Sequence, residues 1–166
     1  MDNRSEKILC VLAGFDDASS EYIMRLQQSL ACAGFDGKQT KNLLPHITLC
    51  TADASQLSPL TKLMEHAACS SAFSVDFQHI GLFSGGSVLF LAPDINRKLL
   101  RLKETFSAEE SWTAHTTLLI DTPENIRAAL PTVTAQFKPF MAKVTSLHLY
   151  EFWPTRHILS LQLQSQ

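Results

Sequence analysis

The chain alternates between apolar runs of strand length and longer segments whose apolar residues recur at helical spacing. Residues 7–14 form a continuous apolar run, which predicts a strand. Within residues 22–33 the apolar positions recur at helical spacing up to Gly34, a residue type that commonly ends a helix. The first two elements are therefore expected to be a strand and then a helix.

The rest of the chain continues this alternation. Alternating apolar residues predict a strand that starts at residue 73 and runs to 83, turns at 84–86 and returns over 87–92 as a β-hairpin. Pro131 lacks the amide hydrogen that a helix interior needs, so we expect the helix that opens at Thr122 to kink or end there. Further strands are expected over 46–51, 115–120, 143–152 and 157–163. A helix is expected to begin with Ser58 as its N-cap, and another is expected after Asp94. The basic residues of this second helix should be largely exposed, namely Arg97, Lys98, Arg101 and Lys103.

A shift of 69 residues, which carries position 46 onto 115, superposes one half of this pattern on the other. The order of strand, helix, strand and tight turn keeps register, and the first strand and helix would then correspond to those over 87–106. We therefore expect one α/β (α+β) domain over residues 1–166, built as two pseudo-symmetric lobes across a groove. The identical pairs are His46 and His115, Thr48 and Thr117, Leu49 and Leu118, Val75 and Val144, His79 and His148, and Phe83 and Phe152.

Composition and charge narrow the class of partner. The 166 residues are 45% hydrophobic and 18% charged, enough apolar material for a real core. The formal net charge of −2 and pI of about 6.3 are unlike those of a protein that neutralises many phosphates along an extended DNA duplex. A nucleotide or an RNA end fits this charge better, and we expect a monomer.

Cysteine use and hydropathy bear on the compartment. Cys10, Cys32, Cys50 and Cys69 lie far apart, without a Cys-x-x-Cys pair or a preceding secretory leader, which favours free thiols and a cytoplasmic location. The apolar stretch over 8–15 is too short to cross a membrane, so no membrane association is expected.

The repeated His-x-Thr segments carry the strongest chemical signal. Residues i and i+2 of a strand share a face, so His46 with Thr48, and His115 with Thr117, can address one ligand. Of two imidazoles that flank a phosphate, one can accept a proton while the other donates one, and the threonine hydroxyls can bind the phosphate oxygens. This chemistry requires no metal and no other cofactor.

Both motifs resemble the signature of the two-histidine (2H) phosphoesterase superfamily, which includes bacterial 2′-5′ RNA ligase-like proteins and cyclic nucleotide phosphodiesterases. The first motif lies within Pro-His-Ile-Thr-Leu at 45–49 and the second within Trp-Thr-Ala-His-Thr-Thr-Leu at 112–118. Residues 80–83 and 87–93 resemble the strand-turn-strand segment between the motifs of that superfamily. Ala114 stands where a proline often precedes the second histidine, a departure expected to affect loop rigidity rather than chemistry.

The resemblance implies a bilobal fold in which two antiparallel-rich sheets flank a central groove, with helices outside. It also implies metal-independent hydrolysis of 2′,3′-cyclic phosphates, or of other 2′-linked phosphodiesters, at nucleotide or RNA ends. Relatives in the 2′-5′ RNA ligase branch can run the reverse joining reaction on RNA (tRNA) ends. The alternatives are therefore a 2′-5′ RNA ligase, or a non-catalytic protein that binds RNA ends or nucleotides.

Several other residues are candidates for binding substrate, each with a structural alternative. An aromatic side chain near a motif can stack on a nucleobase or pack in the core, and a basic side chain can bind phosphate or remain solvated. His79 and His148 share the register of the repeat but are interpreted as structural, and a zinc site is disfavoured because the usual spacing of Cys or His ligands is missing. The pattern does not say which motif histidine is acid and which is base. The candidate substrate-binding residues are Phe83, Trp112, Arg156, His157 and Lys41.

Overall fold

The computed structural model describes residues 7–165, which form strands and helices in the alternating order expected. Strand and helix boundaries agree closely with the apolar periodicity, and the hairpin around 84–86 is present. The elements are β1 (Ile8–Phe15), α1 (Asp17–Cys32), β2 (His46–Asp53), a 3-10 turn η1 (Ala54–Gln56), α2 (Leu57–Ala68), β3 (Phe73–Leu82), β4 (Val88–Pro93), α3 (Arg97–Phe106), β5 (Thr116–Ile120), α4 (Pro123–Gln136), β6 (Phe140–Phe152) and β7 (Arg156–Gln162).

Within residues 7–165, seven strands form one antiparallel sheet in the order β2-β1-β6-β3-β4-β5, with β7 paired to β6. The two antiparallel-rich sheets that the resemblance implied are joined here into this one sheet. The 13-residue β6 spans both lobes: residues 140–144 pair with β3, whereas residues 144–152 pair with β1. The two expected sheets are therefore halves of one continuous sheet.

The strand order reads the same from both ends when β1 is exchanged with β4, β2 with β5, and β3 with β6. This is the symmetry expected of an internal duplication, and it confirms the pseudo-twofold fold predicted from the 69-residue register. It also matches the first strand and helix to β4 and α3. β7 lies outside the repeat and extends the sheet beside β6 alone.

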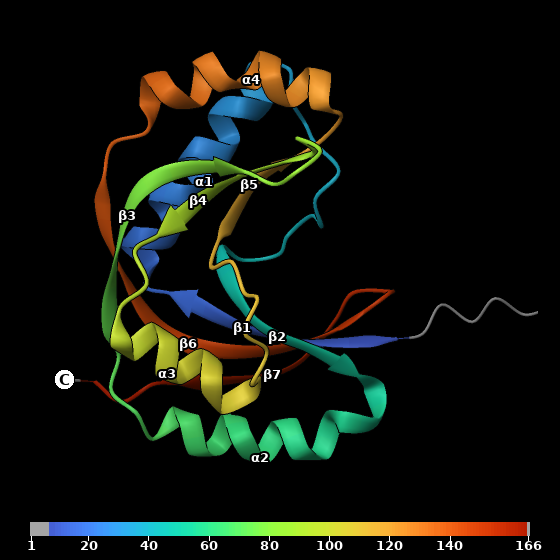
Figure 1. Ribbon diagram of the computed structural model, residues 1–166, viewed down its shortest axis with the longest axis vertical. Coiled ribbons are helices and arrows are strands. Elements are labelled where there is room, and N and C mark those ends of the chain that lie inside the picture. The colour runs from blue at the N-terminus through green and yellow to red at the C-terminus, as the bar shows by residue number, and fades with distance from the viewer. Residues whose placement is uncertain (1–6, 166) are drawn as a thin grey trace, which may run out of the picture.

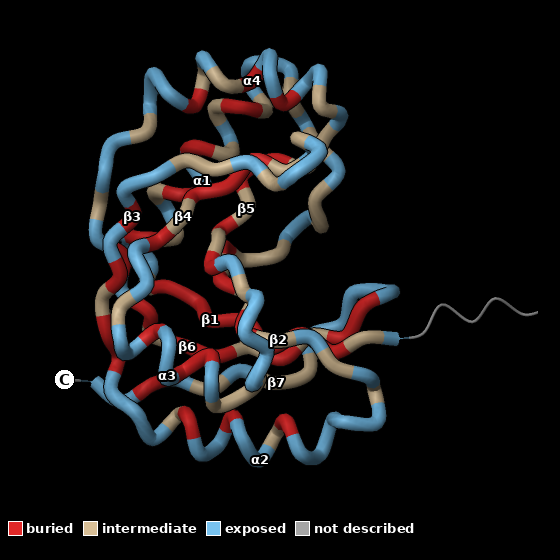
Figure 2. The backbone as a smooth tube through the Cα atoms, in the orientation of Figure 1, coloured by how far each residue is buried: buried red, intermediate tan, exposed pale blue. Residues whose placement is uncertain are grey.

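The helices cover the sheet in two pairs, α1 with α4 and α2 with α3 (Figure 1). α1 of the first repeat contacts β5 of the second, and α3 of the second contacts β2 of the first. Each repeat therefore packs a helix on the other repeat's motif strand. The buried residues lie where the helices meet the sheet, in both halves of the molecule (Figure 2).

The helix α4 does not break at Pro131, contrary to the prediction. It continues to Gln136, with Pro131 on its exposed side. Ile126, Ala129 and Val133 are fully buried on the opposite face, and their burial holds the helix together despite the backbone hydrogen bond that proline cannot donate. The helix α2 also begins two residues earlier than predicted, because its N-cap is Gln56 rather than Ser58 and its first helical residue is Leu57.

Thr116 offers a direct test of this packing. Its side chain is 1% exposed, and its hydroxyl has no hydrogen-bond partner among the described residues. The equivalent position of the first repeat is the buried, apolar Ile47. Because a buried hydroxyl without a partner costs about 1 kcal/mol or more, we expect Thr116→Val to raise the free energy of unfolding by about 1 kcal/mol in urea denaturation.

The matched control is Thr117→Val, on the half-exposed face of the same strand. This change should leave the free energy of unfolding nearly unaltered, since the lost hydroxyl is within reach of water. A destabilised Thr116→Val protein would show that the hydroxyl has a partner in the folded state.

Candidate active site

The two His-x-Thr motifs lie at the two edges of the sheet, on β2 and β5, and these edge strands contact each other. His46 opens β2, with Thr48 on the same face, whereas His115 directly precedes β5, which carries Thr117. The indole Nε1 of Trp112 donates a hydrogen bond of 3.0 Å to the carbonyl oxygen of Thr48. The loop before the second motif is thereby tied to the first motif strand, and the two motifs come together.

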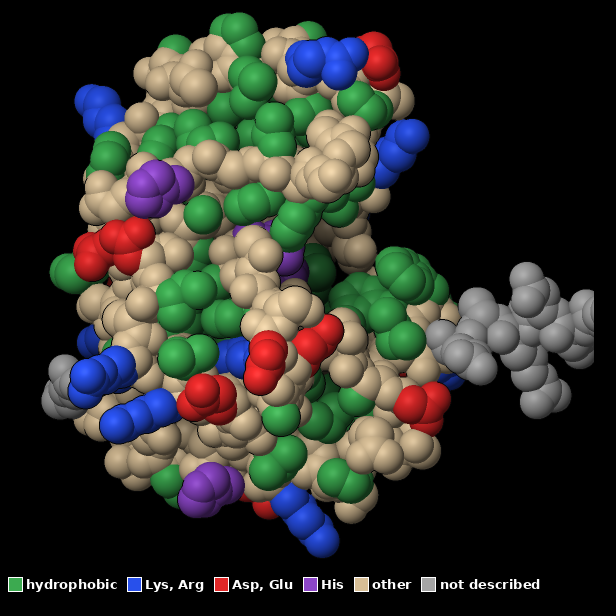
Figure 3. Space-filling view, in the orientation of Figure 1, with side chains coloured by type: hydrophobic (Ala, Val, Ile, Leu, Met, Phe, Trp, Pro, Cys, Tyr) green, Lys and Arg blue, Asp and Glu red, His purple; other side chains and the backbone are tan. Residues whose placement is uncertain are grey.

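A pocket lies at this junction. Figure 3 shows the molecule hollowed beside the junction of its two halves, with histidine side chains deep in the hollow. Residues from both repeats line the pocket, among them Thr48, Cys50, Phe83, Lys103, Trp112 and His115.

The two motif histidines are held in the same way. Nδ1 of His46 lies 2.7 Å from the carbonyl oxygen of Leu44, and Nδ1 of His115 lies 2.8 Å from the carbonyl oxygen of Thr113. A carbonyl oxygen only accepts, so Nδ1 carries the proton and donates in both rings. Each hydrogen bond reaches back two residues, fixes the ring orientation and leaves Nε2 for a ligand.

The surroundings of His46 favour its neutral form. Burial lowers its pKa below the ordinary value, because a charged imidazole loses hydration there. The hydrogen bond to Leu44 raises the pKa, and the nearby charge of His115 lowers it by a smaller amount than burial does. His46 is therefore neutral at pH 7 in the free protein and can accept a proton at Nε2.

The motif threonines offer hydroxyl groups on the same faces as the histidines. Thr48 and Thr117 are half-buried, and in the part of the chain that the structure describes neither hydroxyl makes a hydrogen bond to another residue. Their backbones, in contrast, are anchored, because the carbonyl oxygen of Thr117 accepts a hydrogen bond of 3.0 Å from Gln27 on α1. The hydroxyls are available to a ligand on fixed strands.

Aromatic rings pack around His115. The Phe83 ring meets the His115 ring edge-on, with centroids 4.8 Å apart, and the Phe90 ring lies 5.3 Å from it. Phe83 therefore contacts the second motif histidine, and its role in binding substrate stays a prediction. Phe90 was missed, because a phenylalanine within an apolar strand carries no signal that separates a site position from the core.

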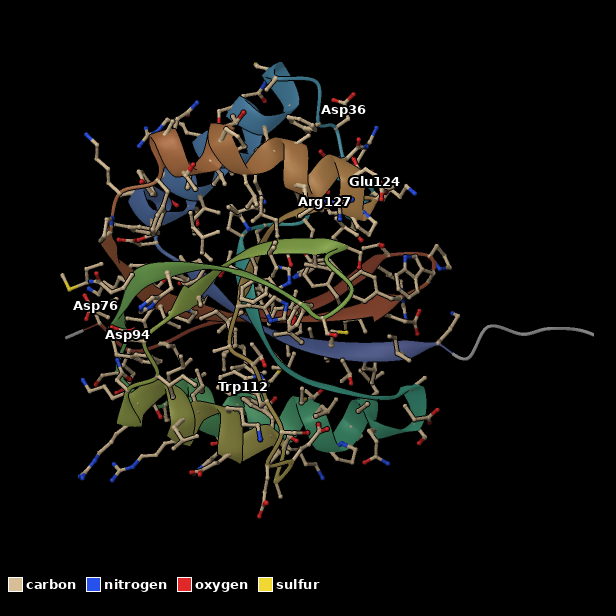
Figure 4. The ribbon with its side chains drawn as sticks, turned by 45° about the horizontal axis from the view of Figure 1, so that its top comes forward. Asp36, Asp76, Asp94, Trp112, Glu124 and Arg127 are labelled. Atoms are coloured by element: carbon tan, nitrogen blue, oxygen red, sulfur yellow. The ribbon has the colours of Figure 1, made fainter. Side chains whose placement is uncertain are left out.

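Trp112 lies beside α3 (Figure 4), and its ring covers Lys103, whose Nζ is 5.9 Å from the ring centroid. Lys103 was expected at the surface, but it is only 4% exposed. Its ammonium donates to the backbone carbonyl of Glu109, so the loop before the second motif wraps over this side chain. The helical pattern places Lys103 correctly on α3 but contains no information on what the following loop covers.

Arg156 and His157 point to opposite faces of the β6–β7 hairpin. Arg156 lies opposite Glu151 and donates to its carboxylate over 3.2 Å, with Lys7 on the same carboxylate at 3.1 Å. His157 lies opposite Tyr150, with ring centroids 5.0 Å apart. His157 thus shares a face with Tyr150, whereas Arg156 is in an ion pair on the other face.

Lys41 is exposed on the loop before β2. His79 is also exposed, and its Nδ1 lies 3.6 Å from a carboxylate oxygen of Asp94. Neither His79 nor Asp94 is among the residues that line the pocket at the junction of β2 and β5. The register of the repeat therefore does not bring His79 into the pocket.

His148 lies closer to the motif residues. Its Nε2 is 2.9 Å from the Ser146 hydroxyl, and its Nδ1 is 2.6 Å from the Ser160 hydroxyl. Burial, followed by the charges of His157 and His46, lowers its pKa to about 4. Gly14, directly opposite His46 on β1, makes room for this group, because a Cβ atom there would come within 2.7 Å of His148 Nε2.

Within residues 7–165, no group of three or more His, Cys, Asp or Glu side chains is arranged to hold a metal ion. None of the described helices is both long and apolar enough to cross a membrane.

Comparison with known proteins bears on the family. The family model described as the 2′-5′ RNA ligase superfamily matches residues 15–152. The crystal structures of E. coli LigT complexed with ATP and with 3′-AMP each share 18% sequence identity and a TM-score of 0.65 with this chain, covering 98% of it and 100% of LigT. The structure of TT0787 of Thermus thermophilus shares 14% identity and a TM-score of 0.65, covering 96% of this chain and 99% of that one. No curated protein matches.

The similar structures show a shared fold, and the family match spans both motifs, the hairpin between them and all of β6. The resemblance stated from Pro-His-Ile-Thr-Leu and Trp-Thr-Ala-His-Thr-Thr-Leu is thereby confirmed. This chain belongs to the 2′-5′ RNA ligase superfamily and so to the 2H phosphoesterases.

Proposed function

We propose that this protein hydrolyses 2′,3′-cyclic phosphates, or other 2′-linked phosphodiesters, at nucleotide or RNA ends. The observation that carries the proposal is the matched pair of histidines at the junction of the two edge strands. Each holds its Nδ1 proton on a backbone carbonyl and leaves Nε2 free, with a threonine hydroxyl beside it on the same face. The LigT complexes with ATP and 3′-AMP support a nucleotide ligand for this fold.

In the proposed reaction, neutral His46 takes a proton from water as the water oxygen bonds to phosphorus. The bond from phosphorus to one ribose oxygen breaks, and protonated His115 donates its Nε2 proton to that oxygen. The lowered pKa of His46 favours this division of roles, because the base must be neutral at the start. Thr48 and Thr117 donate to the non-bridging oxygens, where negative charge grows in the transition state.

The 2′-5′ RNA ligase reaction is the second candidate, and the family match favours keeping it. The same acid and base can serve it in the same roles when a ribose hydroxyl replaces water: His46 takes the proton of the attacking hydroxyl, and His115 protonates the ribose oxygen that leaves phosphorus. Hydrolysis is the proposed direction because the pocket is open to solvent, so water can compete with a ribose hydroxyl as the nucleophile. A protein that only binds nucleotides or RNA ends would not need two histidines with free Nε2 atoms.

His46→Ala and His115→Ala should each lower kcat/KM for a 2′,3′-cyclic nucleotide by about 10² to 10⁴-fold, since each removes one proton transfer. Release of the monophosphate, measured by chromatography with and without a chelator, checks this expectation. The control is His66→Ala, because His66 is exposed on α2. Full activity in either motif variant would refute the proposal, and tight binding by the wild type without turnover would favour a binding protein.

The roles of the two histidines can be separated with a p-nitrophenyl phosphodiester. Nitrophenolate leaves without needing a proton, so a general acid contributes little to its departure. We therefore expect His115→Ala to lose much less activity on this substrate than on a cyclic nucleotide, whereas His46→Ala loses activity on both. The opposite pattern would make His46 the acid.

The pH dependence of kcat/KM tests the state of His46 in the free enzyme. Burial lowers the pKa of His46 below 6.5, so the neutral base is lost only as the pH falls below that value. We expect the acidic limb of the kcat/KM profile to have its midpoint below pH 6.5. An acidic limb centred above this value would contradict the assignment of His46 as base.

A further inference from the structure

The β6–β7 hairpin carries a second group of side chains on the same sheet face as the first motif. Of the hydrogen-bonding side chains in this group, only His148 has an identical counterpart in the other repeat, the exposed His79. The face bears a network of hydrogen bonds among the hydroxyls of Ser146 and Ser160 and the rings of His148 and His157. In the register of the sheet, Thr48 lies opposite Leu12, which lies opposite His148. The network is therefore two strand spacings, or about 10 Å, from the motif threonine.

The polar network leads into a row of aromatic rings. Tyr150 faces His157 across the hairpin, with centroids 5.0 Å apart, and stacks at 6.1 Å on Phe152. Phe152 contacts Trp153, which is 63% exposed. Cys10 and Leu12 form the floor beneath this row, in an apolar cluster separate from the main core.

The chemistry of this face fits a nucleoside better than a phosphate. His148 belongs to this face and is neutral in the free protein, because burial lowers its pKa to about 4. The basic residue of the hairpin, Arg156, is engaged with Glu151 on the opposite face. What remains are serine hydroxyls, imidazole rings and aromatic rings, a combination that can bind bases of single-stranded RNA through hydrogen bonds and stacking.

The two repeats differ at the position of Tyr150. The 69-residue register equates Tyr150 with Gly81, so the second-motif half has no side chain at this position. Phe90 fills the space instead, because a Cβ atom at Gly81 would collide with its ring, and Phe90 then packs against His115. In the second-motif half, the Phe90 ring fills the space up to His115. In the first-motif half, the corresponding face continues outward along β6 and β7.

We propose that the face formed by Tyr150, His157 and the Ser146–His148–Ser160 network is a subsite for the nucleoside next to the reacting phosphate, so that the substrate is an RNA oligonucleotide rather than a mononucleotide. The inference rests on the proposed function for the position of the phosphate. Tyr150 stacks on the neighbouring base, and His157 supports the edge of the Tyr150 ring.

The test measures binding, so that it does not depend on turnover. The probes are a 5′-fluorescein-labelled RNA trinucleotide with a terminal 2′-phosphate, followed by fluorescence anisotropy, and an unlabelled nucleoside 2′-monophosphate used as competitor. Because stacking on one ring typically changes base affinity by an order of magnitude, Tyr150→Leu should weaken trinucleotide binding about tenfold. It should weaken monophosphate binding less than about twofold, and Tyr150→Phe should restore trinucleotide affinity.

His157→Ala guards against a folding artefact, because His157 is exposed and its loss does not disturb the floor of Cys10 and Leu12. It should weaken trinucleotide binding in the same direction as Tyr150→Leu. Unchanged trinucleotide affinity in both variants, equal weakening for the two probes, or no binding of RNA by the wild type would each overturn the subsite. If the protein cleaves no cyclic phosphate but Tyr150→Leu still selectively weakens trinucleotide binding, the proposed reaction fails and the subsite stands.

Discussion

The candidate active site depends on the meeting of the two edges of one sheet. β2 and β5 stand at opposite ends of the strand order, yet they contact each other, so the sheet must curl until its edges approach. The long β6 allows this by pairing with β1 along one part and with β3 along another. The hydrogen bond from Trp112 to the Thr48 carbonyl then joins the edges directly. Without that curl, His46 and His115 would lie at the far ends of a broad sheet.

The meeting of the two edges also protects the edge strands β2 and β5, which carry the motifs. An edge strand has unpaired backbone groups on one side, which in most sheets must be protected from other chains. Here the free side of each edge faces the other motif, and the hydrogen bond from Trp112 uses one of the exposed carbonyl groups. Two helices also hold the edges together, because α1 of the first repeat packs on β5 of the second, and α3 of the second repeat packs on β2 of the first.

Local periodicity was enough to predict most of the elements and the pair of motifs, because alternation and helical spacing are properties of neighbouring residues. The 69-residue register further predicted which elements correspond, and the palindromic strand order agrees with it. What could not be predicted depends on distant packing. The continuous sheet follows from how far β6 reaches, the burial of Lys103 follows from a loop that folds over α3, and the intact helix at Pro131 follows from its buried opposite face.

The pocket also contains a thiol, and its state bears on how the phosphate is attacked. Cys50 lines the pocket with Thr48 and His115, but burial raises its pKa, as burial and the nearby Cys50 raise that of Cys10 to about 11. A thiol is a weak nucleophile until it loses its proton, so Cys50 is held in its inert form at neutral pH. In the proposed reaction, attack is then left to an oxygen nucleophile, either water or a ribose hydroxyl, activated by an imidazole. Under that proposal the same pair of histidines can activate either oxygen, because a general base accepts a proton equally from water and from a ribose hydroxyl.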